Sequence, residues 1–115
     1  MKEPCITLTT ERINNMQIDL NRDGEKLTAV MHGRIDTVSA PEAEEILLNA
    51  LDGVTDLVLD FEDIQYISSA GLRVLLLAYK KMVPVGTMKL IHVSDVVKDI
   101  LEITGFLELL NVQDE

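Results

Sequence analysis

The sequence predicts an α/β fold: a single domain in which a mixed β-sheet, opened by an N-terminal hairpin, has helices packed on it. Two strand-like segments flank an Asp-Gly turn, and after them the chain alternates between helix-like and strand-like apolar patterns. The 115 residues, 47% of them hydrophobic, suffice for one core but leave no room for two domains. We expect a strand or tail over residues 1–13, the domain over 14–112 and a polar tail over 113–115.

The N-terminal half of this domain contains the expected hairpin and the first helix. Residues 16–20 alternate apolar and polar side chains, residues 27–31 are mostly apolar, and Asp23-Gly24 between them is typical of a tight turn. The sequence Ser-Ala-Pro-Glu from Ser39 onward is typical of a capping box with proline in the first helical turn. The helix that follows should bury one apolar stripe, formed by Ala43, Ile46, Leu47, Ala50 and Leu51, and should stop at Gly53.

The middle of the chain contains a strand and a helix joined by a short polar segment. Residues 56–61 are a β-rich run with apolar residues at successive positions, which is typical of a strand covered by protein on both faces. We therefore expect a central strand here. The extended segment should end near Ile67, and a helix should begin near Gly71. The side chains that this helix should place against the sheet are Leu72, Leu75, Leu76, Tyr79 and Met82.

The C-terminal part should add two strands and one helix. Residues 88–93 have the composition of a strand, and Ser94 is placed to cap the helix that follows. Gly105 should end this helix, and residues 107–111 should form a final short strand. The apolar side chains that we expect to face inward from the helix are Val96, Val97, Ile100, Leu101 and Ile103.

Composition and charge exclude several function classes. The chain has 10 Lys and Arg against 20 Asp and Glu, and a net charge of −10 opposes contact with nucleic-acid phosphates and with anionic membranes. No Trp is present to stack on bases. Cys5 is alone, no apolar stretch reaches the ~18 residues of a membrane span, and the N-terminus lacks a secretory signal. These features predict a cytoplasmic protein whose partner is another protein.

The residue patterns offer no convincing catalytic, metal or cofactor site. His32 and His92 lie in predicted strands and no cysteine pairs with them, so we expect no metal site. A triad of Ser69, His92 and Asp60 lacks the Gly-x-Ser-x-Gly elbow of hydrolases. Phosphorylation of Asp60, as in receiver domains, lacks the acidic pair that holds a divalent cation. No glycine-rich phosphate loop occurs, and we therefore predict neither an enzyme nor a cofactor.

One junction remains, where Ser68 and Ser69 lie between the strand ending near Ile67 and the next helix. A helix N-terminus has unpaired backbone N–H groups and a partial positive charge, which suit a serine cap, an oxyanion or a phosphoserine. The residues alone leave the two roles open: either serine could be a cap, and either could be modified.

Residues 60–73, with Ile-Ser-Ser-Ala-Gly-Leu-Arg at their end, resemble the STAS family, the domains shared by anti-sigma factor antagonists and sulfate transporters. Residues 33–36 resemble the turn with an acidic residue in that family, and residues 94–107 resemble its last helix and glycine stop. The resemblance spans residues 14–112 and implies a STAS-type fold. The absence of a membrane-spanning segment favours a free-standing antagonist over the tail of a transporter.

In this family, an anti-sigma factor that is also a serine kinase phosphorylates the hydroxyl residue two before the glycine of the motif. The resemblance thus implies phosphorylation of Ser69, with Ser68 as a minor candidate. It implies that the unmodified chain binds the anti-sigma factor and frees the sigma factor. The phosphorylated chain is released, and a metal-dependent serine phosphatase restores it.

The same resemblance implies a partner surface, in which Asp36 should lie near Ser69. Its expected residues are Asp36, Thr37, Ser68, Ser69, Ala70, Gly71, Leu72 and Arg73. The sequence departs from the best-known members at Ser68, where they have Asp. Two alternatives remain: a constitutive STAS scaffold or transport-accessory subunit that is never phosphorylated, and a nucleotide-binding or weakly catalytic domain.

Overall fold

The structure is a computed structural model and describes residues 6–13 and 16–113. The expected tails fall partly on residues 1–5 and 114–115, which lie outside the described residues. The elements, in chain order, are β1 (Ile6–Ile13), β2 (Met16–Asp23), β3 (Lys26–Ile35), α1 (Ala40–Ala50), β4 (Asp56–Ile67), α2 (Ser69–Met82), β5 (Thr87–Ile91), α3 (Asp95–Ile103), α4 (Phe106–Leu109) and β6 (Asn111–Gln113).

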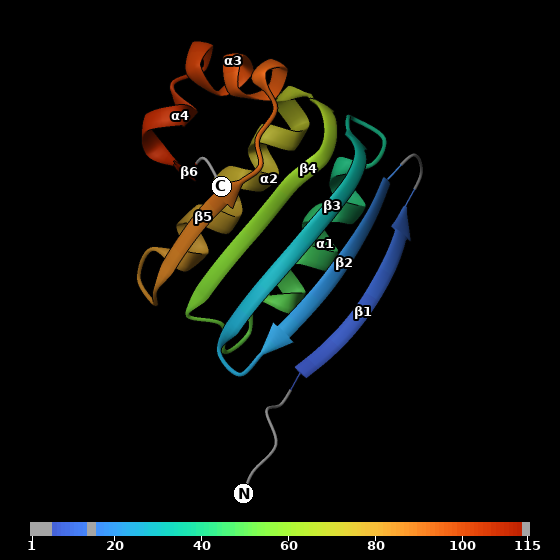
Figure 1. The fold of residues 1–115 in the computed structure, drawn as a ribbon, viewed down its shortest axis with the longest axis vertical. Coiled ribbons are helices and arrows are strands. Elements are labelled where there is room, and N and C mark those ends of the chain that lie inside the picture. The colour runs from blue at the N-terminus through green and yellow to red at the C-terminus, as the bar shows by residue number, and fades with distance from the viewer. Residues whose placement is uncertain (1–5, 14–15, 114–115) are drawn as a thin grey trace, which may run out of the picture.

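The strands form one six-stranded sheet in the order β1-β2-β3-β4-β5-β6 (Figure 1). The first three strands pair antiparallel, and the pairs β3–β4, β4–β5 and β5–β6 are parallel. Asp23 pairs with Lys26 across the β2–β3 turn, and Gly24 has φ +63°, a conformation that glycine adopts without strain. The predicted mixed sheet with an N-terminal hairpin is thus confirmed.

Helices α1 and α2 lie side by side behind one face of the sheet (Figure 1). Between them and the sheet is an aliphatic core, to which Leu47 of α1, Leu75 of α2 and Phe61 of β4 each contribute a fully buried side chain. The predicted stripe of α1 faces this core. In α2 the predicted stripe does so except for Leu76, while Val74 and Ala78, which were not predicted, are buried in the core. Within the part of the chain that the structure describes, no helix is long and apolar enough to cross a membrane.

The expected central strand is confirmed, because β4 lies between β3 and β5, although α1 and α2 lie behind only one of its faces (Figure 1). The buried side chains of α1, α2 and α3 belong to one core, and the partly buried Phe106 and Leu107 of α4 pack against it. Val58 points away from this core and is nevertheless only 4% exposed. It lies between Thr28 and Lys89, its register partners in β3 and β5, and the side chains of neighbouring strands bury it.

Two expectations about the C-terminal part are wrong. Val96 and Ile103 are 57% and 84% exposed, because the buried stripe of α3 runs through Val97 and Leu101 and both residues lie off it. The strand expected over residues 107–111 begins only at Asn111. Residues 106–109 instead form α4, whose turn closes with a hydrogen bond from Leu110 N to the Phe106 carbonyl at 2.8 Å.

Candidate functional site

The candidate site is the edge of the sheet where β3 and β4 end. Ile35 pairs with Ile67 in the register of these strands, and Ser68 N donates a hydrogen bond to the Ile35 carbonyl at 2.8 Å. The two chain segments that follow, one beginning at Asp36 and the other at Ser68, therefore leave the sheet next to each other. Each leads into a helix, α1 or α2, on the same face (Figure 1).

Ser68 is the residue that caps α2. Its backbone is extended, and its Oγ accepts a hydrogen bond from Gly71 N at 3.3 Å. Its carbonyl accepts the first hydrogen bond of the helix, from Leu72 N at 2.9 Å. The sequence left the capping role open between two serines, and the geometry gives it to Ser68.

Ser69 is the first residue of α2, and its side chain is exposed. Among the described residues its hydroxyl has no hydrogen-bond partner. The first turn of the helix contains no acidic residue, so the positive end of the helix dipole is not offset by a carboxylate of that turn. The Ser69 hydroxyl is accordingly accessible to solvent.

Gly71 brings the first turn of α2 directly onto the ends of the two strands. A Cβ at this position would lie 2.6 Å from Ile67 Cγ1 and 2.7 Å from Ile35 Cγ2, closer than carbon atoms approach. Gly71 and Leu72 are buried and lie beneath the surface. Arg73 is exposed, and its Nε lies 3.8 Å from Glu44 Oε1 of α1.

The turn before α1 is closed by its own hydrogen bonds. Asp36 Oδ1 accepts hydrogen bonds from the backbone N–H groups of Ser39 and Val38, each at 3.0 Å. The Ser39 hydroxyl accepts from Asp36 N at 3.1 Å and lies 2.9 Å from the Arg34 carbonyl, to which it donates. The predicted capping box is therefore wrong, because Ser39 is fully buried and bonds backwards to the turn instead of capping α1.

These hydrogen bonds also set the charge of the turn. The bond from the Ser39 backbone N–H is the main reason that the pKa of Asp36 lies below its usual value. Asp36 is therefore a carboxylate at neutral pH, and Thr37 beside it is exposed. A hollow lined by Ala40, Pro41, Glu44, Ala70 and Arg73 joins the starts of α1 and α2. We call the surface formed by Asp36, Thr37, Ser68, Ser69, Ala70 and Arg73 the switch edge.

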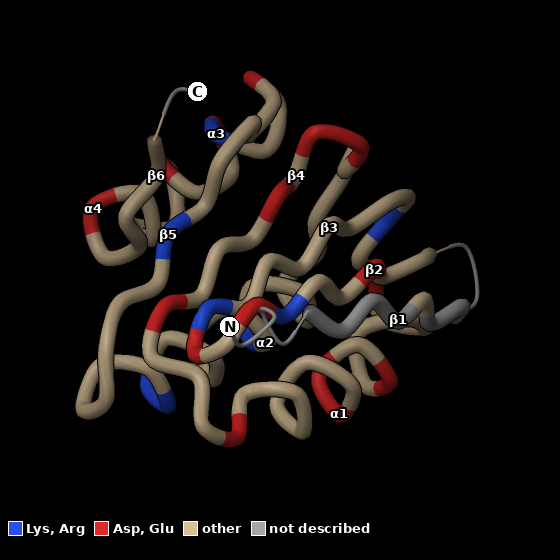
Figure 2. The backbone as a smooth tube through the Cα atoms, turned by 60° about the horizontal axis from the view of Figure 1, so that its bottom comes forward, with Lys and Arg blue, Asp and Glu red and all other residues tan. Residues whose placement is uncertain are grey.

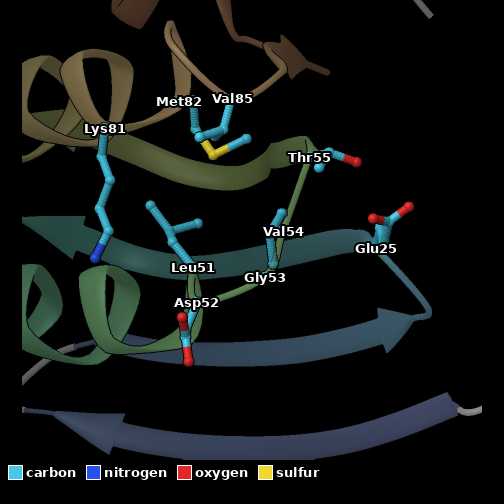
Figure 3. Close-up of a pocket in the computed structure, with 9 residues that line it drawn as sticks. All are labelled: Glu25, Leu51, Asp52, Gly53, Val54, Thr55, Lys81, Met82 and Val85. Carbon is cyan, nitrogen blue, oxygen red and sulfur yellow. The ribbon is translucent and has the colours of Figure 1, made fainter.

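A second candidate is a pocket of about 330 Å³ near the opposite end of α2 (Figure 3). Its apolar lining includes Leu51, Met82 and Val85, with Lys81 at one side. Lys81 Nζ donates a hydrogen bond to the Leu48 carbonyl at 3.2 Å. None of the site residues predicted from the sequence lines this pocket.

The two histidines have different surroundings. His32 lies in β3 between two carboxylates: Nδ1 is 2.6 Å from Asp63 Oδ2, and Nε2 is 3.0 Å from Asp19 Oδ2. The hydrogen bond with Asp63 is the main cause that raises the pKa of His32 above its usual value. His92 was expected in a strand, but it follows β5 with φ +57°. Its Nδ1 lies 3.0 Å from Asp60 Oδ1.

The triad of Ser69, His92 and Asp60 is not assembled. His92 and Asp60 do meet, but Asp60 lies seven residues before the end of β4 at Ile67, which is roughly 20 Å of strand. Sequence reasoning missed Glu62, which joins this pair as a neighbour. The signal was the spacing of Asp60 and Glu62, which puts both on one face of a strand, but placing His92 beside them required the β4–β5 register.

Comparison with known proteins finds one family model and several anti-sigma factor antagonists that are similar to this chain. The family model for the STAS domain matches residues 17–115. BtrV of Bordetella bronchiseptica, named as a candidate anti-sigma factor antagonist, is 34% identical over 99 residues, which cover 84% of this chain and 85% of BtrV. The anti-sigma-B factor antagonist of Bacillus subtilis is 26% identical over 99 residues, covering 85% and 91% of the two chains.

Solved structures show the same fold at lower sequence identity. The anti-sigma factor antagonist SpoIIAA in its unphosphorylated form superposes with a TM-score of 0.71 at 17% identity, covering 95% of this chain and 88% of SpoIIAA. Bacillus SpoIIAA in the phosphorylated form has a TM-score of 0.64 at 16% identity, covering 95% and 91%.

Proposed function

The chain belongs to the STAS domain family, as the anti-sigma factor antagonists do, and on that premise we propose that it is a phosphorylation-controlled antagonist in a partner-switching circuit. The unmodified chain binds an anti-sigma factor that is also a serine kinase, and the sigma factor is freed. Phosphorylation of Ser69 releases the antagonist, and a serine phosphatase restores it. The protein acts in the cytoplasm, without catalytic activity of its own and without direct contact with nucleic acid or membrane.

The observation that carries this proposal is the difference between the two serines at the start of α2. The Ser68 hydroxyl is engaged as the cap, at 3.3 Å from Gly71 N. The Ser69 hydroxyl is exposed and has no hydrogen-bond partner among the described residues. A kinase could take up the Ser69 hydroxyl without first breaking the cap of the helix, which supports Ser69 as the acceptor.

The relatives support the same mechanism. Two of them are named for anti-sigma factor antagonism, and one structural neighbour, SpoIIAA, exists in an unphosphorylated and a phosphorylated form. A phosphate adds about −1.5 to −2 charges and three bulky oxygens. Ser69 is an exposed residue of the switch edge, so a phosphate there would disrupt a close-packed contact by bulk and by the cost of removing its water.

The experiment compares the affinity of four proteins for the cognate anti-sigma factor: the wild type, Ser69→Ala, Ser69→Glu and the control Ser68→Ala. We expect Ser69→Glu to bind about tenfold more weakly or worse, a loss of about 1.4 kcal/mol, because it places a charge in the contact. Ser69→Ala should bind as the wild type does and should remain bound when ATP is added. Equal affinity of Ser69→Glu and Ser69→Ala, with no effect of ATP, contradicts the proposal and favours a constitutive STAS scaffold.

A further inference from the structure

Asp60, Glu62 and His92 form a cluster of one imidazole and two carboxylates, which we call the β4–β5 cluster. Their ligand atoms lie within 4.8 Å of one another. In the described ranges 6–13 and 16–113, no other group of three or more His, Cys, Asp or Glu residues is arranged to hold a metal ion. We propose that the β4–β5 cluster binds a Zn²⁺ ion.

The distances fit a tetrahedral ion. Zn²⁺ binds imidazole nitrogen and carboxylate oxygen at about 2.0–2.2 Å, so two ligand atoms of one tetrahedron lie about 3.3–3.6 Å apart. His92 Nδ1 is 3.0 Å from Asp60 Oδ1 and 4.0 Å from Glu62 Oε2, which brackets this value. A small rotation of the Glu62 side chain, which is 75% exposed, completes the set. The fourth position is left to water or to a group of a partner.

The fold holds two of the three ligands in place. Asp60 pairs with Ile91 in the β4–β5 ladder, and its side chain is only 15% exposed. Asp60 Oδ1 also accepts a hydrogen bond from Glu62 N at 3.0 Å, which orients the carboxylate. His92 follows Ile91 directly with φ +57°, and it is the one described non-glycine residue with a positive φ. This sharp change of direction accompanies the approach of the imidazole to Asp60.

The other histidine shows what distinguishes this cluster. His32 also has two carboxylate neighbours, but Asp63 and Asp19 bind opposite nitrogens of its ring. An ion at one nitrogen could therefore reach one of the two carboxylates and not the other. At His92 both carboxylates face the same nitrogen, Nδ1, as a shared ion requires.

The site is separate from the switch edge. Asp60 alternates with Leu59 and Phe61, which point into the core, so its carboxylate is on the face of the sheet that no helix covers. Figure 2 shows acidic positions along β4 on this part of the molecule. An ion here offsets the charge of two carboxylates on an acidic protein and offers an open coordination position to a partner.

The test is a titration of the full chain with ZnCl₂, followed by NMR of the imidazole signals and by calorimetry. The protein has two histidines, and the Cys5→Ala background removes its one thiol as a competing ligand. We expect one equivalent of Zn²⁺ to shift the signals of His92 and to leave those of His32 unchanged. We expect His92→Ala and Glu62→Gln each to lower the affinity about tenfold or more, whereas the matched control His32→Ala keeps it.

Three results overturn the proposal. The first is an equal shift of both histidines, which indicates loose binding to a charged surface. The second is an unchanged affinity in His92→Ala or in Glu62→Gln; the latter removes an exposed carboxylate and should leave the fold intact. The third is equally tight binding of Mg²⁺ with no shift at His92, which indicates an acidic surface that needs no imidazole.

Discussion

Two turns leave the same edge of the sheet, and each contains a serine followed by an alanine at the start of a helix. In the turn before α1, Ser39 is fully buried, and its hydroxyl is held between the Arg34 carbonyl and Asp36 N. In the turn before α2, Ser69 is exposed and its hydroxyl is free of hydrogen bonds among the described residues. The first turn is held by its own hydrogen bonds, and the second presents an exposed hydroxyl.

The difference comes from the neighbouring residues. The Asp36 carboxylate accepts the backbone N–H groups of the first turn, which leaves the Ser39 hydroxyl to bridge the turn to the end of β3. In the second turn Ser68 takes the capping role, which leaves Ser69 with none. A serine before a helix is therefore structural or available according to which other polar group caps the turn.

The largest expected effect on stability comes from a side chain added at Gly71, where the first turn of α2 packs on the ends of β3 and β4. Gly71→Val should lower the free energy of unfolding by about 3 kcal/mol, because its side chain collides with Ile35 and Ile67 at the ends of both strands. Gly71→Ala should lower it less. Urea unfolding followed by circular dichroism measures both. If neither variant is destabilised, the close packing of α2 on the two strands is wrong.

A smaller loss of stability should follow from breaking the Ser39 hydrogen bonds in the turn before α1. Ser39→Ala removes a fully buried hydroxyl and leaves Asp36 N and the Arg34 carbonyl without this partner at a part-buried turn, which should cost about 2 kcal/mol. The same unfolding experiment measures it. Ser69→Ala is the matched control in the other turn and should stay within about 0.5 kcal/mol of the wild type. A similar cost for the two alanines would remove the contrast between the turns.

The smallest loss of stability should follow from removing the Ser68 cap of α2. Ser68→Ala should lower stability by about 1 kcal/mol, because Gly71 N loses the hydroxyl oxygen that it donates to. Thermal unfolding of Ser68→Ala beside Ser69→Ala measures the difference. A larger loss in Ser69→Ala than in Ser68→Ala would mean that the two serines have exchanged roles.

Much of the fold could be predicted from local sequence. The hairpin turn, the end of β4 near Ile67 and most of the apolar face of α2 follow from patterns that tertiary contacts did not override. The role of Ser39 could not be predicted, because Asp36, three residues earlier, bonds the backbone groups of the turn. The cluster at His92 depends on the register of two strands, which no local pattern contains.

The dependence of structure on tertiary contacts also explains the wrong predictions near the C-terminus. Residues 107–111 are as apolar as a strand, but the helical turn between Phe106 and Leu110 was set by Gly105 and by packing on the core. The inward face of α3 was predicted too wide, because a helix of nine residues buries only a narrow stripe against its neighbours.

The proposal that Ser69 is the phosphorylated residue is tested most directly by locating the phosphate. The wild type, Ser68→Ala and Ser69→Ala are each incubated with the cognate anti-sigma factor kinase and ATP, and the modified residue is identified by mass spectrometry. We predict phosphate on Ser69 in the wild type and in Ser68→Ala, and none in Ser69→Ala. Phosphate on Ser68 alone, or on neither serine, would contradict the assignment of Ser69 as the switch.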